Sequence, residues 1–119
     1  MEQVEKFRKL KVWQEARILV KEIYEITATF PSHELYSLVS QMRRAVLSIL
    51  ANIAEGTKRQ TVKDRRHFYV MSDTSLEEVK CYIIVAYDLK YIVAEQGERL
   101  TNRARSIGRM LNGLIRKKD

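Results

Sequence analysis

Apolar residues recur at spacings of three and four along almost the whole chain, and this periodicity constrains the fold more than any other feature of the sequence. Residues 12–30 begin the pattern with core-facing positions Val12, Ala16, Leu19, Ile23, Thr27 and Phe30. Such a repeat forms one apolar stripe on an α-helix, which must then face a core. One proline and four glycines leave little turn chemistry, so long helices are favoured over a sheet-rich fold.

A second helix is expected over residues 33–55, separated from the first by Pro31. We expect Ser32 to cap its first turn and Gly56 to form a left-handed cap after its last. The expected core positions are Leu35, Leu38, Val39, Met42, Val46, Ile49 and Ile53. A separate apolar line lies about 120° round the helix axis and consists of Tyr36, Leu47, Leu50 and Ala54.

Residues 62–93 and 98–115 are expected to form the third and fourth helices. Thr61 with Asp64 three residues later resembles a capping box at the start of the third. Its expected core positions are Phe68, Met71, Ser75, Val79, Tyr82, Ala86 and Leu89, and its separate apolar line is Tyr69, Leu76, Ile83 and Tyr87. The residues of the fourth helix expected to face the core are Leu100, Ala104, Ile107, Leu111 and Leu114.

Four helices with short connections predict an all-α fold, an antiparallel up-down-up-down four-helix bundle formed by one domain over residues 1–119. The separate apolar lines favour assembly into a symmetric homo-oligomer, although an overpacked core also produces extra apolar residues. The interface candidates are Leu47, Leu50, Ala54, Tyr69, Leu76, Ile83 and Tyr87.

The sequence offers little for catalysis, metal binding or membrane insertion. His33 and His67 have no fixed acidic or cysteine partner, and Cys81 alone excludes an intrachain disulfide and a multi-cysteine zinc site. No phosphate-cradling glycine loop, HExxH or GxSxG motif occurs. The chain has neither a long apolar stretch nor a signal-peptide core. We therefore expect a cytoplasmic protein with no catalytic activity, no cofactor and no metal.

Positive charge is concentrated in two places. The net charge is +7, and residues 58–66 carry +4 while residues 99–119 carry +6. Clustering of this kind favours a polyanionic partner over a merely solvated basic surface, which remains the alternative. The sequence has neither the spacing of a helix-turn-helix motif nor an aromatic RNA-binding strand. We therefore expect the protein to contact a nucleic acid through charge and shape rather than by reading bases. The nucleic-acid-binding candidates are Arg105, Arg109 and Arg116, supported by Arg103, Lys117 and Lys118, and Lys58, Arg59, Lys63, Arg65 and Arg66.

Polar and small residues interrupt the second helix along one flank of its core face. They are Gln41, Ala45, Ser48 and Asn52, with Arg44 and Glu55 just beyond. Small residues permit close helix approach, and amide side chains tie helices together when they are fully hydrogen-bonded. We expect this structural role, with Arg43 or Arg44 paired to Glu78. The alternative is a ligand pocket lined by Arg44, Asn52 and Glu55.

Two stretches, "LKVWQEARILVKEIYEITATFP" and "YSLVSQMRRAVLSILANIAEGTKR", closely resemble the bacterial four-helix-bundle proteins encoded by intervening sequences in the 23S ribosomal RNA gene. The stretch "SLEEVKCYIIVAYDLKYI" extends the similarity through the third helix. The resemblance implies a ring-like homopentamer. It also implies distant similarity to the accessory protein of diversity-generating retroelements, a basic barrel that binds nucleic acid and a reverse transcriptase. The matching motif residues are Gln41, Arg43, Arg44, Ala45, Ser48, Asn52, Glu55 and Gly56.

The chain departs from this family pattern at two positions. Leu50 stands where the family often has proline, which favours a straighter second helix here. Thr74 stands where the family often has glycine, which limits how closely the third helix approaches its neighbour. The resemblance implies an architecture and a mode of assembly for this chain, but it implies no biochemical activity.

Three functions follow as hypotheses. The favoured one is an oligomer that binds structured RNA or another nucleic acid. The second is a protein-interaction scaffold, for example an accessory subunit of a reverse transcriptase. The third, an enzyme or ligand sensor built round Arg44, Asn52 and Glu55, has the least support.

Overall fold

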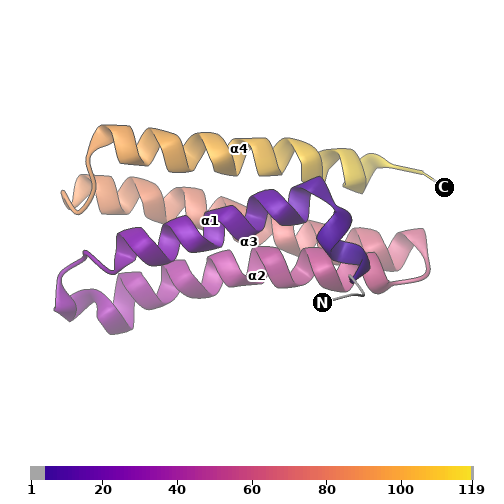
Figure 1. The fold of residues 1–119 in the computed structure, drawn as a ribbon, viewed down its shortest axis with the longest axis horizontal. Helices are drawn as coiled ribbons and strands as arrows, with labels where there is room; N and C mark the ends of the chain where they lie inside the picture. The colour runs from indigo at the N-terminus through magenta and orange to yellow at the C-terminus, as the bar shows by residue number, and fades with distance from the viewer. Residues whose placement is uncertain (1–4, 119) are drawn as a thin grey trace.

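The computed structural model describes residues 5–118, which form four long helices with short connections (Figure 1). The helices are α1 (Lys11–Thr27), α2 (Ser40–Lys58), α3 (Val62–Asp88) and α4 (Ala94–Arg116). Two 3-10 turns, η1 (Lys6–Lys9) and η2 (Ser32–Glu34), and a π-helical turn, η3 (Leu35–Val39), complete the chain. No strand occurs among these residues, so the all-α prediction is confirmed. Residues 1–4 and 119 of the expected domain lie outside the described part.

Successive helices run antiparallel and pack side by side, as the up-down-up-down prediction requires (Figure 1). Each helix contacts two neighbours, because α1 also packs against α4 and so closes the bundle. The α3–α4 pair therefore lies across the core from the α1–α2 pair. This arrangement buries one stripe of every helix in a single shared core.

The expected inward stripes of α1, α2 and α4 form most of this core. All six positions expected for residues 12–30 are buried, as are the first four of the five expected in α4. In the second helix the expectation is correct for Val39, Met42, Val46, Ile49 and Ile53. Leu35, the first residue of the π-helical turn, is exposed, contrary to expectation.

The buried face of α3 lies between the two apolar lines expected from the sequence, so the expected core face is correct for Ser75, Val79 and Ala86 and wrong for other positions. Tyr69, Leu76 and Ile83 are 5%, 1% and 2% exposed in the single chain, so they belong to its own core and are not available to a neighbouring copy. Met71 and Leu89, expected to point inward, are exposed. The face of α3 that packs in the bundle therefore takes members from both expected lines. The buried residues of α3 are Tyr69, Ser72, Ser75, Leu76, Val79, Ile83 and Ala86.

Gly56 lies inside α2 and is not its left-handed cap, since α2 continues to Lys58 and no described glycine has a positive φ. Its role is to permit close helix packing. A Cβ placed on Gly56 would lie 2.7 Å from Cε1 of Tyr69 and 3.2 Å from Cβ of Phe68. The missing side chain thus lets the Tyr69 ring lie against the backbone of α2.

The end of α3 and the start of α4 also differ from the expected boundaries. Lys90 adopts a φ of 65°, and the amides of Lys90 and Tyr91 donate to the carbonyls of Tyr87 and Ala86. This is a Schellman termination, with lysine at the left-handed position where glycine is usual. The helix therefore ends at Asp88 rather than Val93. Ser32 likewise forms no side-chain cap, whereas Thr61 caps α3 by accepting from the Asp64 amide.

Tyr91 joins the two connections at the end of the bundle remote from the chain termini. Its ring lies 5.1 Å from that of Phe30, and its hydroxyl donates to Glu34 at 2.6 Å. Ser37 donates to the other carboxylate oxygen at 2.6 Å. These two hydrogen bonds stabilise the ionised carboxylate and lower the pKa of Glu34 below its ordinary value of 4.5. The hydrogen bond with Glu34 also raises the pKa of Tyr91 above its ordinary value.

Replacing Gly56 with alanine is expected to destabilise the bundle, because the new methyl group collides with the Tyr69 ring. The free energy of unfolding should fall by about 1–3 kcal/mol. The matched control is Gly113→Ala, where a Cβ meets nothing within 4 Å and the helix gains roughly 0.5–1 kcal/mol. Urea denaturation of the two variants checks the prediction. Equal free energies of unfolding would contradict the assigned role of Gly56.

The two hydrogen bonds to Glu34, from Ser37 and from Tyr91, are expected to make stability depend on pH in the acid range. Because the pKa of Glu34 is lower in the folded state, its contribution is present above pH 4.5 and is lost as pH falls through the folded-state value. Tyr91→Phe keeps the ring contact with Phe30 but removes the donor. Melting temperatures recorded from neutral to acid pH should therefore fall less steeply for this variant than for the wild type. The control is Tyr36→Phe, since Tyr36 is 92% exposed and makes no hydrogen bond within residues 5–118. If the control variant's melting temperature fell as little as that of Tyr91→Phe, the assignment would be contradicted.

Candidate nucleic-acid interface

Basic residues from three distant parts of the sequence lie at one end of the bundle. The η1 turn, the α2–α3 connection and the C-terminal end of α4 all lie at this end (right in Figure 1). Nε of Arg66, in the first turns of α3, donates to the carbonyl of Ile115 in α4 at 2.8 Å. We call this surface the basic end; its residues are Lys6, Arg8, Lys9, Lys11, Lys58, Arg59, Lys63, Arg65, Arg66, Arg116, Lys117 and Lys118.

Part of the basic end is held in place by local contacts. Arg59 pairs with Glu55 and its guanidinium lies 4.6 Å above the Phe68 ring. Arg65 donates to the carbonyls of Arg59 and Gln60, at 3.2 and 3.0 Å, and so shapes the connection. Lys58 and Lys63 are exposed and form no ion pair within residues 5–118. These two lysines therefore present their full charge to solvent.

Two hollows open at the basic end. One, of about 760 Å³, is bordered by Lys6 and by the residues around the α2–α3 connection. The other, of about 340 Å³, lies where η1, α2, α3 and α4 meet, and Lys6, Arg66 and Lys117 contribute to its lining. The surface is thus concave as well as basic, a shape that concentrates the electrostatic field.

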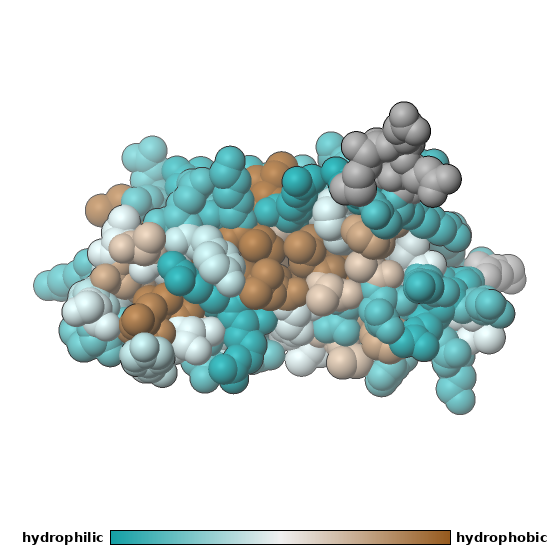
Figure 2. All heavy atoms as spheres, turned by 60° about the horizontal axis from the view of Figure 1, so that its bottom comes forward, coloured by the Kyte–Doolittle hydropathy of each residue, from teal (hydrophilic) through white to brown (hydrophobic). Residues whose placement is uncertain are grey.

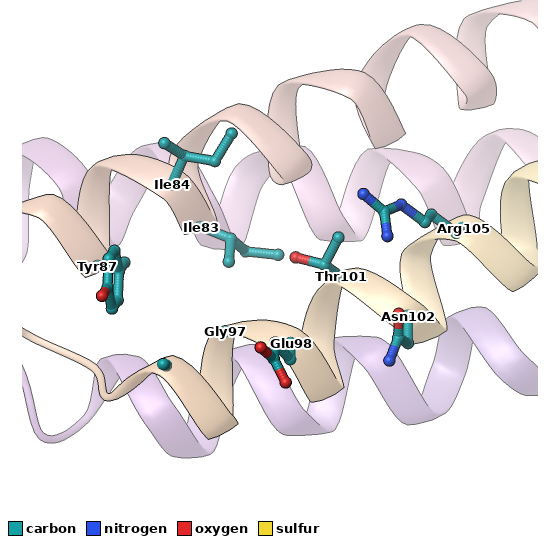
Figure 3. Close-up of a pocket in the computed structure, with 9 residues that line it drawn as sticks. Ile83, Ile84, Tyr87, Gly97, Glu98, Thr101, Asn102 and Arg105 are labelled. Carbon is teal, nitrogen blue, oxygen red and sulfur yellow. The ribbon is translucent and has the colours of Figure 1, made fainter.

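The arginines predicted along α4 separate into two groups. Arg116 belongs to the basic end, whereas Arg105 and Arg109 are exposed farther along the helix. Arg105 lines a groove of about 340 Å³ between α3 and α4, into which Ile83 and Thr101 point from opposite sides (Figure 3). Within residues 5–118 neither Arg105 nor Arg109 has a hydrogen-bonding or ionic partner.

Arg103 does not support this stripe, contrary to expectation. Its guanidinium donates to Glu15 at 2.8 Å and to Glu22 at 2.6 Å, and Arg99 lies 3.6 Å from the second oxygen of Glu22. Both carboxylates belong to α1, so Arg103 joins α4 to α1 across the closing seam of the bundle. Its charge is already neutralised by these partners.

The polar flank of α2 lies against α3, where hydroxyl groups connect the two helices. The hydroxyls of Ser48 and Ser75 are 2.8 Å apart, and Nδ2 of Asn52 donates to the hydroxyl and carbonyl of Ser48. A hollow of about 160 Å³ beside this contact is lined by Gln41, Arg44 and Glu78, among others. Arg44 and Glu78 form no ion pair there.

Arg43 faces the other way and packs against α1. Its Nε donates to the Thr27 hydroxyl at 3.0 Å, and its guanidinium lies 4.6 Å above the Tyr24 ring. The expected pairing of Arg43 with Glu78 is therefore wrong. The motif arginines thus have separate surroundings, with Arg43 at the α1–α2 contact and Arg44 exposed beside α3.

The described residues contain no grouping that suggests catalysis. His33 is exposed near Glu34 and Tyr91, and His67 lies edge-on to the Phe68 ring at 5.2 Å. Cys81 is exposed. Across residues 5–118 no three histidine, cysteine or acidic side chains are placed to hold a metal ion. None of the helices in this part is long and apolar enough to span a membrane.

The sequence-based prediction did not include the basic residues of η1 and the first residue of α1. Lys6, Arg8, Lys9 and Lys11 lie at the basic end because α1 starts there. The available signal was a cluster of four basic residues within six positions of the sequence. This cluster becomes part of a larger basic surface only because the α2–α3 connection and the end of α4 lie at the same end of the bundle. Counting charges along the sequence does not reveal that proximity.

Comparison with known proteins agrees with this architecture. A crystal structure of a protein of unknown function from the S23 ribosomal protein family of Bacteroides thetaiotaomicron superposes with a TM-score of 0.80. The two chains are 21% identical, and the similarity covers 89% of this chain and 99% of the other, which shows a shared fold. No curated protein matches the sequence.

The family assignment rests on the sequence match over most of the chain. Residues 8–113 match the family of 23S rRNA-intervening sequence proteins. This range includes α1, α2 and α3 entirely and most of α4. The chain therefore belongs to the 23S rRNA-intervening sequence protein family.

Proposed function

We propose that this protein binds structured RNA through its basic end, by charge and shape rather than by reading bases. The observation that carries the proposal is the convergence of η1, the α2–α3 connection and the end of α4 on one concave basic surface. The family name supports RNA as the polyanion.

The charge balance at the basic end favours a phosphate backbone as ligand. The carboxylates among its described segments are Glu5, Glu55 and Asp64, and Glu55 is already paired with Arg59. Exposed Lys58, Lys63 and Lys118 are free to approach phosphates, and each neutralised phosphate releases condensed counterions. Binding of this kind depends steeply on salt concentration.

The arginines of α4 extend this surface along the bundle. Arg105, Arg109 and Arg116 are all exposed, and a rise of 1.5 Å per residue places the first and last about 16 Å apart along the helix. This length is comparable with several successive phosphates of a nucleic-acid strand. A duplex or folded RNA that contacts the basic end can therefore also lie along α4.

Removing two exposed lysines is expected to reduce the salt dependence of RNA binding. In the variant Lys58→Gln/Lys63→Gln, the slope of log K against log salt should become shallower by about 1.4–1.8, because each phosphate contact contributes roughly 0.7–0.9. Fluorescence anisotropy with a structured ribosomal RNA fragment and a length-matched DNA duplex, at low and physiological salt, measures this slope and any preference for RNA.

The charge-matched control is Lys21→Gln/Lys90→Gln, which removes two exposed lysines away from the basic end. Its slope should remain that of the wild type. An equal loss of slope in the two variants would mean that overall charge, not the basic end, governs binding. Absence of binding to either nucleic acid at low salt would overturn the proposal and favour a protein-interaction scaffold instead.

We further propose that the chain assembles head to tail into a ring through two different apolar surfaces. One is the α2 line of Leu47, which is exposed, and Leu50 and Ala54, which are half-buried. Figure 2 shows that apolar side chains gather midway along one face of the molecule. The other surface surrounds Tyr87, which is exposed beside the α3–α4 groove. Two unlike surfaces are what a heterologous ring contact requires.

The variant Leu47→Glu/Leu50→Glu is expected to give a smaller, folded species, because charged side chains oppose burial of this surface against a neighbour. Light scattering coupled to gel filtration measures the mass, and circular dichroism verifies the helix content. The control is Ile18→Glu, since Ile18 is 41% exposed and Leu47 is 43% exposed, but Ile18 lies outside the proposed surfaces. An unchanged mass in the double variant would refute the α2 interface.

A further inference from the structure

The smaller hollow at the basic end is a built pocket with its own chemistry. Four segments border it: η1 with the residue that follows it, the last turn of α2, the first turns of α3, and the end of α4. Its volume of about 340 Å³ lies at the lower end of the range for small-molecule sites, which is about 300–1,000 Å³. We call it the end pocket. Its size suits one nucleotide and not a helical segment.

Two hydroxyl groups contribute to the lining of the end pocket. Thr57 and Tyr69 are only 8% and 5% exposed. The Thr57 hydroxyl donates its proton to the carbonyl of Ile53 at 2.9 Å. The Tyr69 hydroxyl therefore has Thr57 as acceptor, at 3.5 Å, which is the long limit for a hydrogen bond. A ligand oxygen at normal distance would be a better acceptor for Tyr69.

The walls of the end pocket are cationic and apolar. Lys6 and Lys117 form no ion pair within residues 5–118, and Arg66 uses only its Nε, toward Ile115. The terminal nitrogens of the Arg66 guanidinium thus remain available to an anion. Leu10 and Leu114 supply apolar surface. Among residues 5–118 no carboxylate lines the pocket, so its described lining favours an anionic ligand with an apolar portion.

We propose that the end pocket binds a nucleotide that carries a terminal phosphate, as the 5′-phosphate end of an RNA strand. The phosphate lies among Arg66, Lys6 and Lys117, and the Tyr69 hydroxyl donates to one of its oxygens or to the sugar. A terminal phosphate carries a charge of about −1.5 to −2 near neutral pH, more than a phosphate inside the strand. A pocket bordered by four segments also admits a chain end more readily than a continuous strand.

This assignment rests on the proposed RNA binding at the basic end and identifies which part of the RNA is recognised. The direct test compares two hairpin RNAs that are identical except for a 5′-phosphate or a 5′-hydroxyl. The phosphorylated RNA is expected to bind roughly tenfold more tightly, because charge-assisted hydrogen bonds are formed only with the terminal group. Adenosine monophosphate, tested alone by thermal shift, shows whether a free nucleotide also occupies the pocket.

Two variants locate the effect. Lys6→Gln/Lys117→Gln should bring the affinity ratio of the two RNAs close to one, and Tyr69→Phe should reduce the ratio while leaving the ring packed against Gly56. The matched control is Lys58→Gln/Lys63→Gln, since neither lysine lines the end pocket. This control should weaken both RNAs equally and keep their ratio unchanged.

The outcomes separate this inference from the proposed function. Equal affinities of the two RNAs for the wild-type protein overturn the end pocket as a phosphate site, while RNA binding itself stands. Stabilisation by adenosine monophosphate without binding of either RNA supports the pocket with a free nucleotide as its ligand and overturns the proposed function. Failure of both RNAs and of the nucleotide to bind overturns both.

Discussion

The close approach of α2 and α3 is the contact on which the rest of the bundle depends. Gly56 has no side chain where the Tyr69 ring lies against α2, and the Ser72 hydroxyl donates to the carbonyl of Ile49 at 2.8 Å. Farther along, Ser48 and Ser75 share a hydrogen bond. Small residues and buried hydroxyls thus bring the two backbones together without leaving a buried polar atom unpaired among the described side chains.

The contact between α2 and α3 also determines where the positively charged side chains of the basic end lie. The connection between α2 and α3 consists of residues 59–61 only, so the cations at this point of the chain lie at the end of the bundle. Arg66 then ties the start of α3 to the end of α4, which adds Arg116 and Lys117 to the same surface. The fold and the basic end are therefore consequences of one packing arrangement, and the end pocket lies where its four segments meet.

The arginines of this protein have different roles: some join two helices, and others are exposed to solvent. Arg43 and Arg103 hold α1 against its two neighbours, through Thr27 and through the pair Glu15 and Glu22. Arg105 and Arg109 remain exposed on α4. A count of charges along the sequence does not distinguish these cases, because it does not show which carboxylates lie opposite each arginine. The outward position predicted for Arg105, Arg109 and Arg116 is thus confirmed, whereas Arg103, predicted to support them, is paired within the bundle.

The sequence by itself determined the number of helices, their order and the inward stripes of α1, α2 and α4, because each of these helices has one dominant apolar line. It did not determine the exact face of α3, because the buried residues combine the line of Tyr69 with part of the line of Phe68, and only packing against the neighbouring helices shows which members are buried. It also did not determine the end of α3, since Lys90 occupies a left-handed position where glycine is the usual signal. Only the tertiary structure brought the basic residues of η1 to those of α3 and α4, because residues far apart in sequence become neighbours only when antiparallel helices return to the same end.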